Sequence, residues 1–345
     1  MGDKAEEKAK SWEVTGLALT AFGVQFSVFS NSLMKTINTV PVLQAMQVRF
    51  LIQWCFTASA GLCLQRRGHQ VHLLGKPETR VLLLGRAAFF ATAILSLWTA
   101  LRMMPVGDAT TIVYLYPVIC GLLANRFLAE SLGWQFWAQA ATCCVGVLLV
   151  TGLGFSGAGE GSYDTGAALA LVAAFGFAST NCCVRALKDV QTIEIQLFTD
   201  SLMAFVAMPC TLLLTGNAMD WTGWHSGVLL RLAGATMFGL TALLIVILGH
   251  QLAPASKATL FTYLEVPSAF LVQMLAFGEV PGPQKACGAA LILAAGLHRF
   301  LAEAAKAPAA ASKVDARPLL TTEDEKEEQT HLDVHAKLPD QAVGV

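Results

Sequence analysis

Long apolar runs alternate with short polar segments along most of the chain. Each run is close to the roughly 20 mostly apolar residues that a helix needs to cross a bilayer. The runs that predict transmembrane helices are 15–34, 42–64, 81–101, 105–127, 133–153, 164–184, 194–215, 228–250, 254–277 and 283–301. The predicted fold class is therefore an all-α polytopic membrane protein with ten transmembrane helices.

Polar segments flank and divide these runs. Residues 1–14 are rich in Lys and Glu, and residues 154–163 form a Gly/Ser-rich linker between two groups of five runs, 15–153 and 164–301. Residues 302–345 carry nine acidic and five basic side chains and no aromatic residue. Such a segment buries too little apolar surface to offset its ordering entropy. We expect a cytosolic N-terminal segment and a disordered acidic cytosolic tail.

The two groups of five runs are copies of each other. At an offset of 150 the first run matches the sixth at Thr15 and Thr165, Gly16 and Gly166, Ala18 and Ala168, Leu19 and Leu169, and Asn31 and Asn181. At an offset of 149 the fourth matches the ninth at Pro105 and Pro254, Ala109 and Ala258, Thr110 and Thr259, Tyr114 and Tyr263, Leu115 and Leu264, and Glu130 and Glu279. Because five is odd, the second copy enters the membrane from the opposite side. Inverted repeats of this kind are typical of secondary transporters, with a substrate site between the halves.

Basic residues in the short loops predict the orientation. With the N-terminus in the cytosol, eleven Lys and Arg residues lie on the cytosolic side and four on the opposite side. Cytosolic loops carry the excess of Lys and Arg, so both termini are expected in the cytosol. The sequence is compatible with the plasma membrane and with an endomembrane.

The composition agrees with a membrane bundle and excludes other classes. Hydrophobic residues make up 55% of the chain and charged residues 14%, the formal net charge is −1, and the mean hydropathy is +0.57. Soluble domains carry about 25% charged residues, and a nucleic-acid binder needs a clustered basic surface. All nine cysteines lie in or beside apolar runs without a Cys-x-x-Cys pair, so neither a metal site nor a disulfide framework is expected. The expected partners are a small-molecule substrate and the lipid bilayer; a homodimer is compatible with the sequence.

Ionisable residues inside the apolar runs are the first candidates for the site, because charges at bilayer depth tend to face a cavity or a partner. Arg49 and Glu265 lie deepest, and an arginine in a cavity suits a carboxylate or a phosphate. Arg86 lies near the cytosolic end of its run and is expected to snorkel to the surface. Asp200 is a candidate for proton coupling or for an ion pair with Arg49.

Asp108 and Lys257 occupy equivalent places near the starts of the fourth and ninth runs. They are candidates for proton coupling, for an ion pair or for substrate contact, and the alternative is that both reach the headgroups.

Tyrosine and asparagine residues supply further candidates for substrate binding. Tyr114, Tyr116 and Tyr263 offer a flat apolar face and a hydroxyl group, and the alternative is that each packs with its hydroxyl on a carbonyl. Asn31 and Asn181 lie at matching depths in the first and sixth runs. We expect each to contact the substrate or to form a hydrogen bond between helices.

Enzyme signatures are missing from the sequence. It contains no Gly-x-Ser-x-Gly, no His-Glu-x-x-His and no phosphate-cradling glycine-rich loop with a lysine. We therefore expect neither an enzyme nor a cofactor.

Two related motifs resemble a known family. The stretch from Leu264 to Ala269, which continues to Gly278-Glu279, and its first-copy counterpart from Ala109 through Tyr116-Pro117 to Glu130 are similar to the signature of EamA-type members of the drug/metabolite transporter superfamily. The nearest resemblance is to the G-like group of solute carrier 35. In this chain Val266 separates the glutamate and proline that are usually adjacent.

The resemblance implies two inverted five-helix repeats around a central cavity. That cavity would be lined mainly by helices one, three, four, six, eight and nine, with Glu130 and Glu279 as structural residues at helix ends. Because the family carries amino acids, nucleotide sugars, organic anions and drugs, it does not name the solute.

The sequence thus predicts a secondary transporter of a small polar or anionic metabolite that works by alternating access. The alternative is a non-transporting membrane adaptor that binds a partner through its acidic tail.

Overall fold

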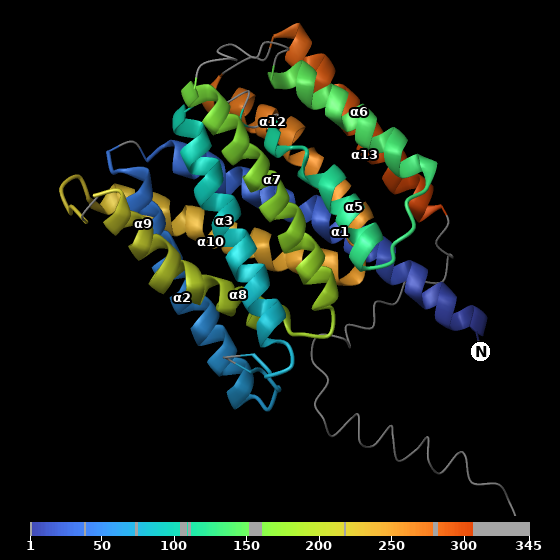
Figure 1. Ribbon diagram of the computed structural model, residues 1–345, viewed down its shortest axis with the longest axis horizontal. Helices are drawn as coiled ribbons and strands as arrows, with labels where there is room; N and C mark the ends of the chain where they lie inside the picture. The colour runs from blue at the N-terminus through green and yellow to red at the C-terminus, as the bar shows by residue number, and fades with distance from the viewer. Residues whose placement is uncertain are drawn as a thin grey trace, which may run out of the picture.

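The computed structural model describes residues 2–37, 39–72, 75–103, 109, 112–151, 161–216, 219–278 and 282–305, and the regular elements within them are helices (Figure 1). In chain order they are α1 (Gly2–Lys35), α2 (Val42–Arg66), α3 (Arg80–Met103), α5 (Tyr116–Phe127), α6 (Trp134–Thr151), α7 (Gly161–Ala186), α8 (Thr192–Leu202), η1 (Met203–Ala207), α9 (Met208–Leu214), α10 (Ser226–Leu252), α11 (Ala255–Ala258), η2 (Thr259–Leu264), α12 (Glu265–Phe277) and α13 (Pro283–Ala304).

Two helices begin before the apolar runs that predict them. The first helix begins at Gly2, so most of the polar N-terminal segment extends α1 instead of preceding it. Its Ala, Glu and Lys residues are among the strongest helix formers. Helix α7 begins at Gly161, inside the predicted linker. The rest of that linker and the tail from residue 306 lie outside the described residues.

Several helices are long and apolar enough to cross a membrane, which makes the chain an integral multi-pass membrane protein. Within the described residues six meet both criteria: Lys10–Met34, Arg80–Ala100, Tyr163–Ala186, Thr192–Leu214, Ser226–Leu252 and Pro283–Ala302. The other predicted spans correspond to α2, α5, α6 and α12. Helix α2 carries polar residues along its length, and α5 and α12 have 12 and 13 residues. A count of ten spans stays a prediction.

Two of the apolar runs contain irregular turns. A π-helical turn, η1, interrupts the run from α8 to α9, and a 3₁₀ segment, η2, precedes α12. Pro267 lies in the first turn of α12, where a missing N–H is tolerated. Pro117 occupies the same kind of position at the start of α5. In both places the α-helix restarts one or two residues before the proline.

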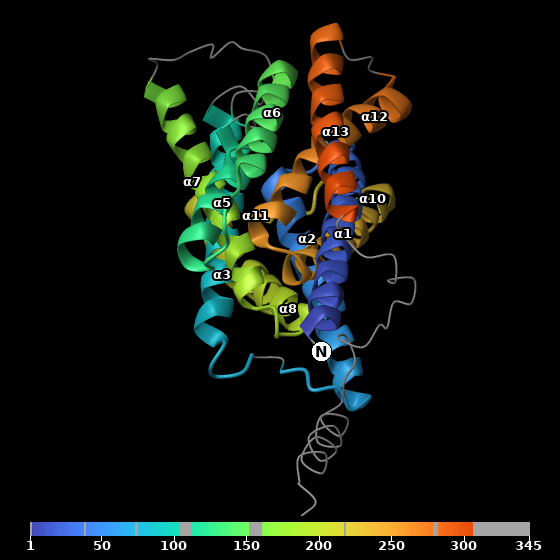
Figure 2. The same cartoon turned by 90° about the vertical axis from the view of Figure 1, so that its right-hand side faces the viewer.

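The most extensive helix contacts join the two copies. Helix α1 packs along α10, α3 packs along α7, and α6 packs along α13. At the repeat offset α1 corresponds to α7 and α10 to α3, so the first two pairs are equivalent. Figure 2 shows α3, α5, α6 and α7 on one side of the molecule and α1, α10, α12 and α13 on the other.

Glycine permits the closest of these contacts. A Cβ atom on Gly16 of α1 would lie 2.8 Å from the Gly249 carbonyl oxygen of α10, and one on Gly249 would lie 2.8 Å from the Gly16 carbonyl oxygen. On the α3–α7 pair, a Cβ on Gly176 would lie 2.9 Å from the Phe89 carbonyl oxygen. Small residues that let backbones touch are a typical device of membrane helix packing.

Candidate functional site

A cavity of about 430 Å³ lies between the two sides of the bundle. Its wall comes from α1, α2, α3, α7 and α10, from Val113, Tyr114 and Tyr116, and from η2 with the start of α12. The resemblance implied all of these except α2. Much of the wall is apolar and aromatic, and this part includes Phe90, Ile94, Leu97, Trp98, Phe177 and Leu243. The volume suits a small organic ligand.

Arg49 brings a positive charge to the cavity from α2. Within the part of the chain that the structure describes, it makes no hydrogen bond and no ion pair, and its buried Nε has no partner. The guanidinium rests on the backbone of α10, because a Cβ on Gly239 would lie 2.2 Å from its Nη2. Glycine at position 239 therefore provides the space that Arg49 occupies.

Arg86 contributes a second guanidinium, and the prediction that it snorkels to the surface is wrong. Its side chain is 2% exposed and lines the cavity. The Nη1 group donates to the Thr199 hydroxyl and to the Ile195 carbonyl oxygen at 3.5 Å, and the guanidinium lies 5.5 Å from the Phe90 ring centre. Helix α8 packs beside α3 and supplies acceptors inside the bundle. The sequence feature that could have placed Arg86 in the cavity was its position as an arginine inside an apolar run.

Asp200 lies behind this wall and is not itself part of it. The carboxylate is fully buried and accepts hydrogen bonds from Gln196 Nε2 at 2.7 Å, Gln53 Nε2 at 2.8 Å and Thr57 Oγ1 at 3.1 Å. Among the described residues it has no ion pair with Arg49, which corrects that alternative. It still interacts electrostatically with Arg49 and Arg86. Gln53 connects Asp200 with the cavity, because it donates to the carboxylate and also lines the cavity wall.

Other predicted residues lie elsewhere on the cavity wall. Asn31 Nδ2 of α1 donates to Glu265 Oε1 of α12 at 3.1 Å. Tyr116 donates its hydroxyl proton to Thr262, and Tyr114 lies beside it with ring centres 6.4 Å apart. Asn31, Glu265 and both tyrosines line the cavity, as does Asn181 of α7.

Besides Asp200, three predicted residues do not line the cavity or cannot be placed. Tyr263 is 1% exposed, and its hydroxyl donates to the Tyr114 carbonyl oxygen at 2.7 Å, so the packed alternative describes it. Lys257 forms an ion pair with Glu13, and neither residue lines the cavity. Asp108 lies outside the described residues.

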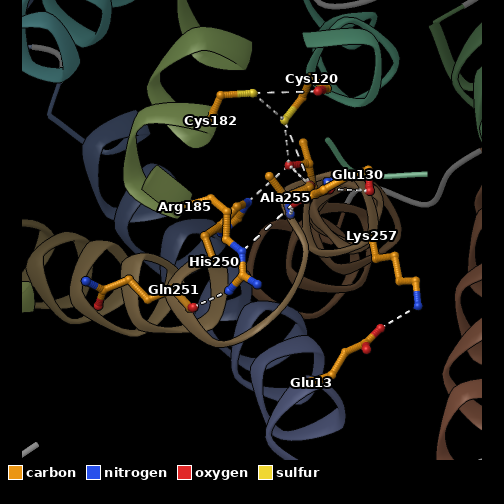
Figure 3. A network of polar contacts seen from close by, with 11 residues as sticks. Glu13, Cys120, Glu130, Cys182, Arg185, His250, Gln251, Ala255 and Lys257 are labelled. Atoms are coloured by element: carbon orange, nitrogen blue, oxygen red, sulfur yellow. Dashed lines mark hydrogen bonds and ion pairs between the residues drawn. The ribbon is translucent and has the colours of Figure 1, made fainter. Parts of the chain in front are cut away.

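A polar network ties helix ends together at one end of the cavity (Figure 3). Glu130, after α5, accepts hydrogen bonds from the Ala255 N–H at 2.8 Å, the Ser256 N–H at 2.9 Å and the Ser256 hydroxyl at 2.6 Å. Arg185 at the end of α7 lies 3.9 Å from Glu130 and donates to the Gln251 carbonyl of α10. Glu130 thus holds the start of α11, in agreement with the helix-end role that the resemblance implied.

The cavity and this network adjoin at His250, a residue near the end of α10 that was not among the candidates from the sequence. His250 is 1% exposed and lines the cavity, and its Nε2 lies 3.1 Å from Thr259 Oγ1. Thr259 Oγ1 in turn lies 2.7 Å from the Ala255 carbonyl oxygen. Among the residues described, no group of three or more His, Cys, Asp or Glu side chains is arranged to hold a metal ion.

Comparison with known proteins agrees with this architecture. A solved structure titled "Crystal structure of protein" has a similar fold, with a TM-score of 0.70 and 18% identity over 85% of this chain and 99% of that chain. A search of curated proteins finds no match. Residues 9–152 and 164–297 each match the sequence profile of the EamA-like transporter family. These two matches coincide with the two copies found in the sequence, and the chain belongs to the EamA-like transporter family.

Proposed function

We propose that the protein is a secondary transporter that moves a small anionic or polar metabolite across the membrane by alternating access. The observation that carries the proposal is Arg49, a guanidinium on the cavity wall without a hydrogen-bond or ion-pair partner among the described residues. Removing a charge from water costs several kcal/mol unless a partner compensates for it. Asp200 interacts with Arg49 electrostatically but forms no ion pair with it among the described residues. A carboxylate or phosphate group of the substrate would be a direct partner, and both match the forked geometry of arginine.

The rest of the wall supports a substrate with an apolar body. Phe90, Trp98 and Phe177 provide aromatic surface between the two arginines and the tyrosines, and Glu265 with Asn31 provides a polar contact elsewhere on the wall. A substrate of this class would place its anionic group at Arg49 and its less polar part along the aromatic residues. A hydroxyl or amino group could then reach Glu265.

The helix packing supports alternating access between two inverted five-helix repeats, residues 15–153 and 164–301. Each extensive contact pairs a helix of one repeat with a helix of the other. Each repeat could therefore adopt the conformation of the other, and the cavity would then open to the opposite side of the membrane. With both termini in the cytosol, the Glu130 network would close the cavity on the cytosolic side.

The test is a thermal-shift screen of the detergent-purified protein with organic acids, sugar phosphates, nucleotide sugars and amino acids. A ligand that binds only the native state raises its stability by about 2.7 kcal/mol at 100 times its dissociation constant. We expect an anionic class to raise the Tm of the wild type and of Arg126→Ala, which removes an exposed arginine, but not of Arg49→Ala. Equal shifts in all three proteins would contradict the proposal.

A further inference from the structure

Asp200 is a buried carboxylate that Gln53 separates from the cavity. The proposed transport of an anion does not by itself assign a role to Asp200. We propose that Asp200 is a proton-coupling site: it takes up a proton when an anionic substrate binds at Arg49, so that proton and anion move together. This inference rests on the proposed function and adds the coupling ion and the residue that carries it.

The surroundings of Asp200 can accommodate both the ionised and the protonated carboxyl group. The ionised carboxylate accepts hydrogen bonds from Gln53 Nε2, Gln196 Nε2 and the Thr57 hydroxyl. The amide oxygens of Gln53 and Gln196 are buried and have no partner among the described residues. Turning either amide by 180° would exchange its NH₂ for its oxygen, and that oxygen could accept the proton of a carboxylic acid.

The charges near Asp200 come from the cavity arginines. Arg49 of α2 and Arg86 of α3 interact electrostatically with the carboxylate, and Cys183 of α7 lies near Arg86. On α10 the titratable group of the cavity wall is His250, which contacts the Val246 carbonyl oxygen and Thr259.

On α8 itself the other carboxyl group is Glu194, which accepts a hydrogen bond from the His72 N–H. Asp200 is therefore the carboxylate on α8 that interacts electrostatically with both cavity arginines.

A substrate anion at Arg49 would compete with Asp200 for the positive charge of Arg49. Two anions beside the arginines repel each other in a poorly solvated site. Protonation of Asp200 removes one of them. The step is a proton transfer from hydronium in the cavity to an Oδ atom of Asp200, which leaves water and a neutral carboxylic acid. Binding of the proton and of the anion must then favour each other by the same factor.

The first test is a pH titration of the full-length protein by infrared difference spectroscopy, which needs no substrate. We expect a band of a protonated carboxyl group that appears on acidification in the wild type and in Glu194→Gln, a control on the same helix. Asp200→Asn should lack this band. A spectrum of Asp200→Asn identical to that of the wild type would overturn the assignment.

The second test measures the affinity of benzoate, phenylacetate and benzenesulfonate between about pH 5.5 and 8.5, where all three anions are fully ionised and their own charge does not change. In the wild type and in Glu194→Gln, affinity should rise about tenfold per pH unit as the pH falls through the range in which Asp200 titrates. Asp200→Asn resembles the protonated form and should bind with the acid-limit affinity at every pH. Asp200→Glu retains a carboxyl group, so it should retain the pH dependence, and it serves as the second variant if Asp200→Asn does not fold.

The outcomes separate the two proposals. Binding of an anion that is independent of pH in the wild type, or equally dependent on pH in Asp200→Asn, would overturn proton coupling at Asp200 and leave the anion site in place. Failure of all three anions to bind at any pH would contradict the anion site, and the infrared titration would still decide whether Asp200 takes up a proton.

Discussion

Gly239 offers a way to displace Arg49 without changing any charge. A Cβ atom at this position would lie 2.2 Å from Arg49 Nη2 and 3.0 Å from Ser30 Oγ, whereas ordinary contact begins at 3.4 Å. In Gly239→Ala the guanidinium must therefore withdraw by about 1 Å, because α10 is held by its contacts with α1. The substitution tests whether the place of Arg49 on the cavity wall, and not merely its charge, matters for binding.

The expected loss can be estimated from the hydrogen bonds at stake. A hydrogen bond to a charged group contributes about 1.5–3 kcal/mol, or roughly 10- to 100-fold in affinity. We expect a loss in this range for anion binding measured by calorimetry. The stability of the fold should change little, because the end of a flexible side chain yields and alanine is a better helix former than glycine by about 1 kcal/mol.

Two controls decide whether the reasoning is correct. Gly85→Ala makes the same change in α3, where a Cβ would meet no atom within 4 Å, and it should bind anions like the wild type. In an Arg49→Ala background, Gly239→Ala should cause no further loss, because the two changes remove the same interaction. Wild-type affinity in Gly239→Ala, or additive losses in the double variant, would refute the account of Arg49.

Three further predictions concern the network, a buried tyrosine and the tail. Glu130→Ala should free the start of α11 and raise the rate at which Cys182, buried in the structure, reacts with a thiol reagent; an unchanged rate would contradict the closing role of the network. Tyr263→Phe should lower the stability to unfolding by about 0.5–1.5 kcal/mol, the value of one hydrogen bond, here to the Tyr114 carbonyl, and an altered anion affinity in calorimetry would place Tyr263 at the site after all. Deleting residues 306–345 should leave flux in proteoliposomes intact, and loss of flux would favour the adaptor alternative.

The hydrophobic pattern predicted most of the helices because the length of an apolar run reflects the thickness of the bilayer. It could not predict the irregular turns η1 and η2, which depend on how neighbouring helices pack. Arg49 and Glu265 were found because a charge in an apolar run is costly wherever it points. The same argument applied to Arg86, but the direction of its side chain depended on acceptors that α8 supplies.

Tyr114 and Tyr263 show a second limit of the sequence. They are equivalent in the repeat, yet Tyr114 lines the cavity and Tyr263 is buried behind it. A structure in which Glu130 ties helix ends together at one end of the cavity gives repeat-related residues different surroundings. Internal symmetry in the sequence therefore predicts pairs of candidates, and the conformation decides which member faces the cavity.

The most direct test of the central claim is counterflow uptake in proteoliposomes, with the anion selected by the thermal-shift screen. Vesicles loaded with the unlabelled anion and containing the wild type or Arg126→Ala should accumulate the labelled anion, and vesicles containing folded Arg49→Ala should accumulate no more than protein-free vesicles. Equal accumulation by Arg49→Ala and the wild type would contradict the claim that Arg49 binds the transported anion.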